Sequence, residues 1–310
     1  MEPILKTMNL TKKYKNKIVV DKINMTINKG EIYGFLGRNG AGKTTTLKMI
    51  MGQAAIDSGC IDIFGKTISH KDYKYKSRIG ILIEAPTFYS KLTAKDNLEI
   101  HRRCMGIQDK KRIDEVLALV DLSNEGSKSV GKYSLGMKQR LGVARALLNS
   151  PEILILDELT NGLDPVGISH IREIILKLNK ERNTTVLICS HILSEIEQMA
   201  TKIGVINHGI LIEEVLYKEL QEKNKTYLQI KVNNQKKAAT ILEQKCGISQ
   251  YKVYEDNIIR IFDNVDEAEN INRNMMDSGV LIRELKVNSE TLEDYFLRLT
   301  TFEKEGPPLP

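Results

Sequence analysis

Tryptophan is absent from the 310 residues, aromatic residues make up only 5% of them, and cysteine occurs four times. So few aromatic rings disfavour a surface on which the bases of single-stranded nucleic acid would stack. The cysteines, Cys60, Cys104, Cys189 and Cys246, include no closely spaced pair. This spacing excludes a cysteine-based metal site and a disulfide framework, so we expect reduced thiols.

Long uncharged stretches are also missing. The longest, Asn183–Ser194, has only twelve residues, whereas a helix needs about twenty to cross a bilayer. No basic, apolar leader is apparent at the start of the sequence. The net charge of +6 is mild, and lysines are mixed with acidic residues. We therefore expect a cytoplasmic protein without a nucleic-acid partner.

The remaining composition is that of a globular protein, with 41% hydrophobic and 28% charged residues. From Ile4 to about Ile212, short β-branched runs alternate with longer helical patterns. This alternation predicts an α/β domain with a mostly parallel sheet covered by helices. The expected strands are Ile32–Leu36, Ile79–Ile83, Ile153–Leu156, Thr185–Cys189 and Ile203–Ile206.

A helical pattern at Thr93–Leu122 interrupts the strands, which predicts a helical insert at about residues 88–150. After Ile212 the character changes, so we predict one domain at 1–217 and a second at 218–310. The second alternates strands and helices in the ferredoxin-like order and ends in a proline-rich tail, which predicts a small α+β domain. Its expected elements are strands Tyr227–Val232, Tyr251–Tyr254, Ile258–Phe262 and Leu281–Lys286 and helices Lys236–Lys245, Val265–Asp277 and Thr291–Leu299.

The segment Gly37–Thr44 reads GRNGAGKT, which fits the phosphate-binding pattern G-x-x-x-x-G-K-[ST]. It follows the first expected strand and opens a helix, so its backbone N–H groups can surround a phosphate. Lys43 supplies a positive charge to the β- and γ-phosphates, and the Thr44 hydroxyl is a Mg²⁺ ligand. Kinases, GTPases and ATPases share this loop. The expected nucleotide-binding residues are Gly37, Asn39, Gly40, Ala41, Gly42, Lys43, Thr44 and Thr45.

A second polar site follows the apolar strand Ile153–Leu156, which ends in Asp157 and Glu158. In a parallel sheet, this end of a strand faces the ligand. Asp157 can hold Mg²⁺ through water, and Glu158 can serve as the base or positioner of the attacking water. The alternative is a solvated acidic strand end.

The segment Tyr133–Arg140 reads YSLGMKQR and leads into a helix. Here the chain resembles the ABC ATPases, whose signature is LSGGQ: Ser134 and Gly136 match, whereas Leu135 and Met137 depart. A hydroxyl and glycine amides at a helix N-terminus make a second anion site. The resemblance implies that this site serves the γ-phosphate of the ATP held by the other subunit.

Other motifs of the family follow in order over residues 1 to about 215. The resemblance implies that Tyr14 stacks on adenine, that Asp164 belongs to a loop contacting the dimer partner, and that His191 reads the γ-phosphate. Glu84 stands where the family normally has a glutamine near Mg²⁺ and the attacking water. We expect Glu84 at the metal, with an altered rate or coupling.

Three segments, IEAP around Glu84, YSLGMKQR and Thr291–Phe296, resemble the bacitracin-resistance and lantibiotic-immunity branch of ABC transporter ATPases. This resemblance implies an ATP-hydrolysing subunit of a bacterial exporter that uses ATP and Mg²⁺, with Lys43, Glu158 and His191 as catalytic residues. It implies a homodimer bound to a separate integral-membrane permease at the inner face of the cell membrane. The exported compound would be a peptide antibiotic.

Two alternatives stay open. A soluble ABC ATPase acting on the ribosome or DNA would carry a coiled-coil insertion or two cassettes, and neither is visible. A degenerate, nucleotide-gated regulatory module would account for the departures in the signature and at Glu84. The presence of Lys43, Asp157, Glu158 and His191 favours an active enzyme.

Overall fold

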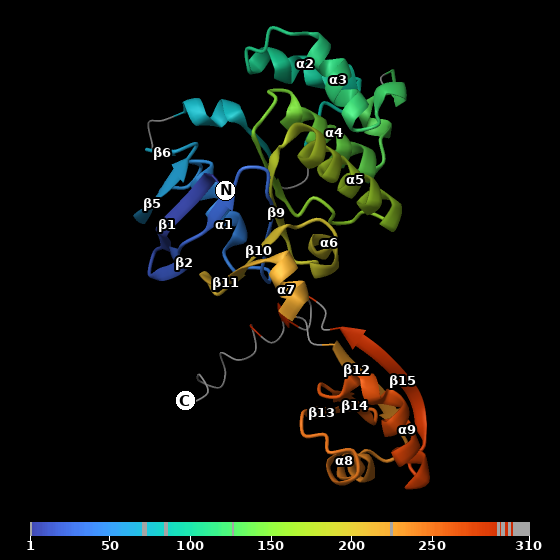
Figure 1. Cartoon of the computed structure of the whole chain (residues 1–310). Coiled ribbons are helices and arrows are strands. Elements are labelled where there is room, and N and C mark those ends of the chain that lie inside the picture. The colour runs from blue at the N-terminus through green and yellow to red at the C-terminus, as the bar shows by residue number, and fades with distance from the viewer. Residues whose placement is uncertain are drawn as a thin grey trace. The chain divides into compact units, whose positions relative to one another are not determined.

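The computed structural model describes residues 2–69, 73–83, 86–125, 127–223 and 226–289, together with 292, 295, 296 and 299. The chain forms two compact units, Met1–Lys218 and Glu219–Pro310 (Figure 1). Glu84 and most of the helix expected at Thr291–Leu299 lie outside the described residues.

The first unit is built on a six-stranded sheet, counted over its described residues, in the order β11-β10-β4-β9-β8-β7. Strands β10, β4, β9, β8 and β7 are parallel, and β11 is antiparallel to β10. The strands are β4 (Ile32–Leu36), β7 (Ile79–Ile83), β8 (Ile153–Asp157), β9 (Thr185–Ser190), β10 (Lys202–Asn207) and β11 (Ile210–Leu216). The predicted parallel sheet is therefore confirmed. Its order places the carboxyl ends of β4, β9 and β8 side by side, and these ends carry the residues expected to bind and hydrolyse nucleotide.

A second, antiparallel sheet of the first unit was not predicted. Within the described ranges it has the order β2-β1-β5-β6, with β3 also paired to β1. The strands are β1 (Pro3–Tyr14), β2 (Lys17–Ile23), β3 (Thr26–Asn28), β5 (Ser58–Ile63) and β6 (Lys66–Thr67). Register shifts in β1 between Leu10 and Lys12 and again between Lys12 and Lys13 break the regular alternation of side chains that would have marked a strand.

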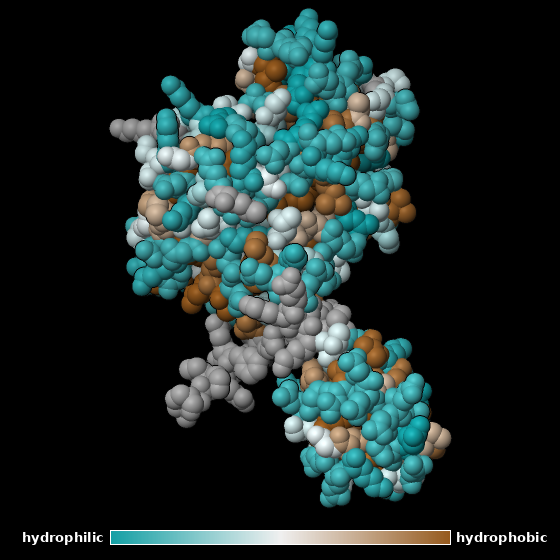
Figure 2. All heavy atoms as spheres, in the orientation of Figure 1, coloured by the Kyte–Doolittle hydropathy of each residue, from teal (hydrophilic) through white to brown (hydrophobic). Residues whose placement is uncertain are grey.

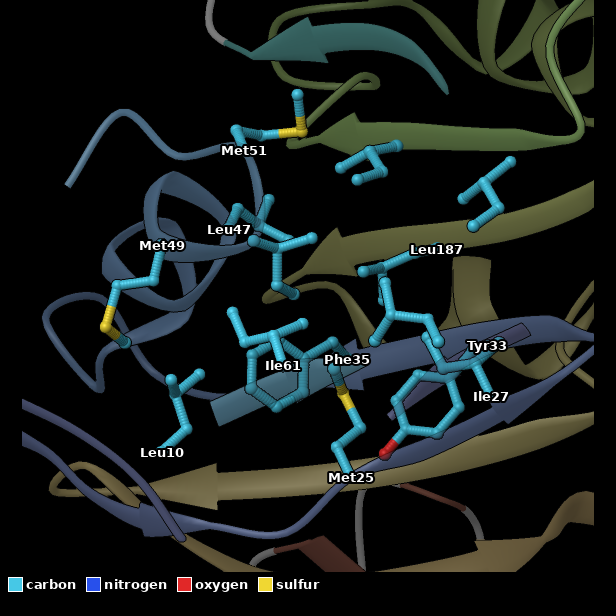
Figure 3. Close-up of a cluster of buried hydrophobic side chains, with 14 of the residues drawn as sticks. Leu10, Met25, Ile27, Tyr33, Phe35, Leu47, Met49, Met51, Ile61 and Leu187 are labelled. Atoms are coloured by element: carbon cyan, nitrogen blue, oxygen red, sulfur yellow. The ribbon is translucent and has the colours of Figure 1, made fainter. Parts of the chain in front are cut away.

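Helix α1 (Lys43–Ile50) shares one hydrophobic core with strands of both sheets. Figure 3 shows Leu47 and Met49 of this helix in one cluster of buried side chains with Phe35 of β4 and Ile61 of β5. These four side chains are at most 1% exposed. Such burial stabilises the fold by about 1.5–3 kcal/mol per large apolar side chain. The core therefore packs α1 against β4.

Residues 88–150 contain three α-helices in their described part: α2 (Ala94–Cys104), α3 (Lys111–Leu119) and α4 (Leu135–Leu147). Thr93 and Asp96 form a capping box that starts α2. Helices α5 (Pro165–Arg182) and α6 (Leu193–Glu197) follow β8 and β9. Short 3₁₀ helices are η1 (Lys74–Arg78), η2 (Ser123–Glu125) and η3 (Val130–Lys132).

The second unit has four antiparallel strands among its described residues, in the order β13-β14-β12-β15. Leu228, Ile230, Ile241, Ile259 and Met275 belong to its core. The elements are α7 (Tyr217–Lys223), which begins in the first unit, β12 (Thr226–Val232), α8 (Gln235–Gln244), β13 (Tyr251–Tyr254), β14 (Ile258–Ile261), η4 (Val265–Glu267), α9 (Ala268–Asp277) and β15 (Ile282–Ser289). From β12 to β15, this order and pairing confirm the predicted ferredoxin-like pattern.

Hydrophilic side chains cover most of the face seen in Figure 2 on both units. Among the helices that the structure describes, none is both long enough and apolar enough to cross a membrane.

Candidate nucleotide-binding and hydrolysis site

The loop between β4 and α1 has the conformation that a phosphate site needs. Gly40 and Gly42 adopt positive φ values of 80° and 112°, and a side chain at Gly42 would meet the backbone oxygen of Val19 at 2.9 Å. No side chain caps α1, so the first N–H groups of the helix can bind a ligand. Lys43 is 4% exposed and its Nζ donates to the Gly37 oxygen at 2.7 Å.

A cavity of about 520 Å³ lies over this loop. This cavity is lined by eight residues that the sequence predicts to bind nucleotide, to bind metal or to act in catalysis. They are Asn39, Gly40, Gly42, Lys43, Thr44, Thr45, Asp157 and Glu158. The phosphate-binding loop after β4 and the end of β8 thus face the same space, because the carboxyl ends of these parallel strands lie at one edge of the sheet with β9 between them. Gly37 and Ala41 belong to the loop but are not among the lining residues.

Thr44 and Asp157 form the part of the cavity that suits a divalent cation. The Thr44 hydroxyl donates to Asp157 Oδ2 at 2.9 Å, and Asp157 is only 4% exposed. Mg²⁺ prefers such oxygen donors and takes one or two carboxylates together with phosphate oxygens and water. The two residues therefore fit Mg²⁺ bound together with a nucleotide.

Glu158 lies where polar groups from three other segments meet. Its Oε1 is 3.8 Å from Lys43 Nζ and 3.4 Å from His191 Nδ1. Its Oε2 accepts a hydrogen bond of 2.5 Å from Asn161 Nδ2. Its φ of +48° is unusual for a residue with a side chain, and strained positions of this kind cluster at functional sites.

A hydrogen bond links the segment that follows β9, which contains His191, to the loop that follows β8. Thr160 donates a short hydrogen bond to the carboxylate of Glu195 on α6. Burial raises the pKa of Glu195, while this hydrogen bond and the nearby His191 act in the opposite direction. Burial, reinforced by Asp157, also raises the pKa of the Cys189 thiol at the end of β9. Cys189 is thus a neutral core residue at neutral pH.

The other predicted binding residues lie outside this cavity. Ser134 caps α4 by accepting from the Met137 N–H at 3.2 Å, and Gly136 is in the first turn of that helix. Asp164 caps α5, accepting from the Gly167 N–H at 3.0 Å. Tyr14, at the end of β1, is 48% exposed. The predicted roles of these residues and of Glu84 stay predictions.

Four cavity residues were not predicted from the sequence: Val19, Leu135, Gln139 and Asn161. Gln139 is 4% exposed, and its Oε1 has no hydrogen-bond partner among the described residues. It lies three residues before Gly142 and four before Val143, which are both buried, and this spacing puts it on the inner face of α4. The position of Gln139 relative to the buried residues of α4, rather than its residue type, was the sequence signal that could have identified it.

The fold and the site together define a P-loop ATPase, with phosphate-binding loop, acidic strand end and histidine-bearing strand side by side in one sheet. Residues 20–161 match the family described as ABC transporter. The chain belongs to the ABC transporter family of ATP-binding proteins, which confirms the family predicted from the motifs, and it hydrolyses ATP.

Two relatives and one solved structure illustrate the similarity. The chain is 47% identical over 299 residues to the bacitracin transport ATP-binding protein BcrA of Bacillus licheniformis, covering 96% of this chain and 98% of the relative. It is 44% identical over 214 residues to the lantibiotic transport ATP-binding protein SrtF of Streptococcus pyogenes, covering 69% and 91%. The dimeric, post-hydrolysis ATP-binding cassette MJ0796, bound to ADP and Pi, aligns with a TM-score of 0.62 and 25% identity over 69% of this chain and 98% of that one.

Proposed function

We propose that this chain is the ATP-hydrolysing subunit of a bacterial exporter that protects the cell against a peptide antibiotic of the bacitracin or lantibiotic type. The support is similarity to a bacitracin transport protein over 299 of the 310 residues, which includes the second unit. An ATPase acting on ribosomes or DNA is not favoured, because both relatives are transport proteins.

The observation that carries the enzymatic part is the convergence of Lys43, Thr44, Asp157 and Glu158 on one cavity, with His191 beside Glu158. Lys43 would exchange the carbonyl oxygens of Gly37 and Arg38 for phosphate oxygens of ATP. Thr44 and Asp157 would hold Mg²⁺, which when bound neutralises charge on the phosphate oxygens.

Glu158 would act as the base. A water molecule attacks the γ-phosphorus and gives its proton to the Glu158 carboxylate, while the bond from phosphorus to the β–γ bridging oxygen breaks and ADP leaves. His191, 3.4 Å from Glu158 Oε1, would contact the γ-phosphate. Glu158 and His191 directly follow the buried strands β8 and β9, and this brings both residues to the same edge of the sheet.

The active form would be a homodimer. At the start of α4, Leu135 lines the cavity of its own chain, whereas the signature residues Ser134 and Gly136 on either side of it do not. A second copy can therefore supply this helix start to the ATP. The dimeric state of a related cassette supports the arrangement. The dimer would bind an integral-membrane permease through the helices of residues 88–150, so that the chain lies at the inner face of the cell membrane.

The direct test replaces the base. Glu158→Gln keeps the size of the side chain but removes the proton acceptor, so turnover should fall by about 10²–10⁴-fold while Mg²⁺-ATP still binds. Steady-state phosphate release and calorimetry measure the two effects. The exposed Glu181→Gln on α5 is the matched control and should behave as wild type. Retained turnover in Glu158→Gln would refute the role of Glu158.

The same variant tests the assembly and the substrate. With Mg²⁺-ATP it should accumulate as a dimer in light scattering, whereas a monomer at saturating ATP would contradict an ATP site shared between two copies of the chain.

Cells that carry the wild-type chain and its permease should tolerate more bacitracin or more of a lantibiotic than cells that carry Glu158→Gln. Equal sensitivity to both compounds would refute the proposed substrate class.

A further inference from the structure

Asn161 makes a direct contact with the proposed catalytic base that the sequence did not indicate. It lies in the loop between β8 and α5, and its Nδ2 donates to Glu158 Oε2 at 2.5 Å. Its backbone N–H also donates to the Glu158 backbone oxygen at 3.3 Å. Asn161 therefore holds both the side chain and the main chain of Glu158.

The backbone of Glu158 explains why such a contact is needed. Glu158 has left the extended conformation of β8, and its φ of +48° is sterically unfavourable for a residue with a side chain. A carboxylate on a strained turn is not aimed by the pleat of the strand. Neighbouring groups must fix its direction.

The other two contacts of this carboxylate come from groups that ATP would engage. Lys43 and His191 both approach Oε1, at 3.8 Å and 3.4 Å. In the mechanism proposed above, both groups turn to the phosphates. Asn161 then remains on Oε2, and Oε1 becomes available to water.

We propose that Asn161 is a positioning residue that orients Glu158 for hydrolysis through its hydrogen bond to Oε2. This inference rests on the proposed role of Glu158 as the base. Because Asp164 of the same loop caps α5, one end of the loop is anchored. The other end is anchored by the hydrogen bond from the Asn161 backbone N–H to the Glu158 backbone oxygen.

The test is a double-mutant cycle. Asn161→Ala should lower kcat about tenfold with an unchanged KM for ATP, because it removes orientation of the base and not nucleotide binding. Asn161→Asp, which keeps the shape but loses the donor, should lower kcat at least as much. In single-turnover reactions, Asn161→Ala should change the rate of the Glu158→Gln chain less than twofold, since its effect passes through Glu158.

Two results would overturn the proposal. A tenfold loss in both backgrounds would show that Asn161 acts independently of Glu158. Failure of the Asn161→Ala, Glu158→Gln double variant to form the ATP-dependent dimer that Glu158→Gln forms would make Asn161 a dimer contact instead. Asn161 is exposed, so its truncation should leave the fold intact, and the exposed Asn124→Ala serves as the control. The Glu158→Gln single variant tests the role of Glu158 as the base, so failure of that role can be distinguished from failure of the role proposed for Asn161.

Discussion

The sequence predicts that two helix N-termini bind the phosphates of ATP, and these two ends differ in side-chain capping and in exposure. At α1, the first turn has no side-chain cap and is buried around Lys43. At α4, Ser134 caps the helix through Met137, and the adjoining Leu135 is 44% exposed. The first site presents bare N–H groups inside one chain, whereas the second presents a capped, exposed end.

This difference indicates which part of the site one chain can supply. The N–H groups at the start of α1 are oriented before any ligand arrives, so little reorganisation of this helix end opposes ATP binding. At α4, an anion can reach the exposed end from outside the chain. A single chain should therefore bind ATP, and hydrolysis should need a second one.

The largest effect should follow from disabling the α1 site. Lys43→Ala removes the buried ammonium group that faces the cavity, so the Kd for ATP should rise about 100-fold or more. Calorimetry with Mg²⁺-ATP measures the change. Lys48→Ala, in the last turn of the same helix, should leave the Kd unchanged. Unaltered affinity in Lys43→Ala would remove the distinction between the two helix ends.

A smaller and more selective effect should follow from changing the α4 site. Ser134→Asp keeps a good helix cap but places a negative charge where the partner's γ-phosphate would lie. ATP binding to the monomer should persist, while kcat and ATP-dependent dimerisation should fall about tenfold or more.

Ser134→Asn is the matched variant, because it caps the helix without adding charge. It should retain most of the activity that Ser134→Asp loses. If both variants lost activity equally, the cap geometry rather than the charge at this end of α4 would control dimerisation.

The sequence could predict those parts of the fold and of the site that depend on short local patterns. The P-loop, the strand ending in Asp157 and Glu158, and the strand before His191 are short local patterns with one structural solution, and the structure brings them together. The antiparallel sheet was missed because β1 carries lysines and register shifts, and because β1 also pairs with β5, which is distant in the sequence. Pairing of this kind leaves little local signal.

Contacts between side chains were also beyond the sequence. Asn161 lies in the same loop as Asp164, which the resemblance assigns to the dimer contact, and the structure shows that its amide reaches the Glu158 carboxylate. Gln139 likewise lies in the segment Tyr133–Arg140, which resembles the signature. Its burial depends on how α4 lies over the cavity, which local patterns do not specify.

Gln139 supports the smallest prediction, which concerns the inner face of α4. Its side chain is buried, and its Oε1 has no hydrogen-bond partner within the described residues, so it costs stability in the free protein. Gln139→Leu has a similar volume and no polar atom. It should raise the free energy of unfolding of the nucleotide-free chain by about 1 kcal/mol, as measured by urea unfolding.

The exposed Gln108→Leu should leave this free energy nearly unchanged, since it alters hydrophobicity without removing a buried polar group. Lower stability of Gln139→Leu would show that the amide is satisfied by water in the free protein. Higher stability together with weaker Mg²⁺-ATP binding would place Gln139 among the groups that face the nucleotide. In that case α4 contributes to the site of its own chain through its inner face and to the partner's site through its exposed end.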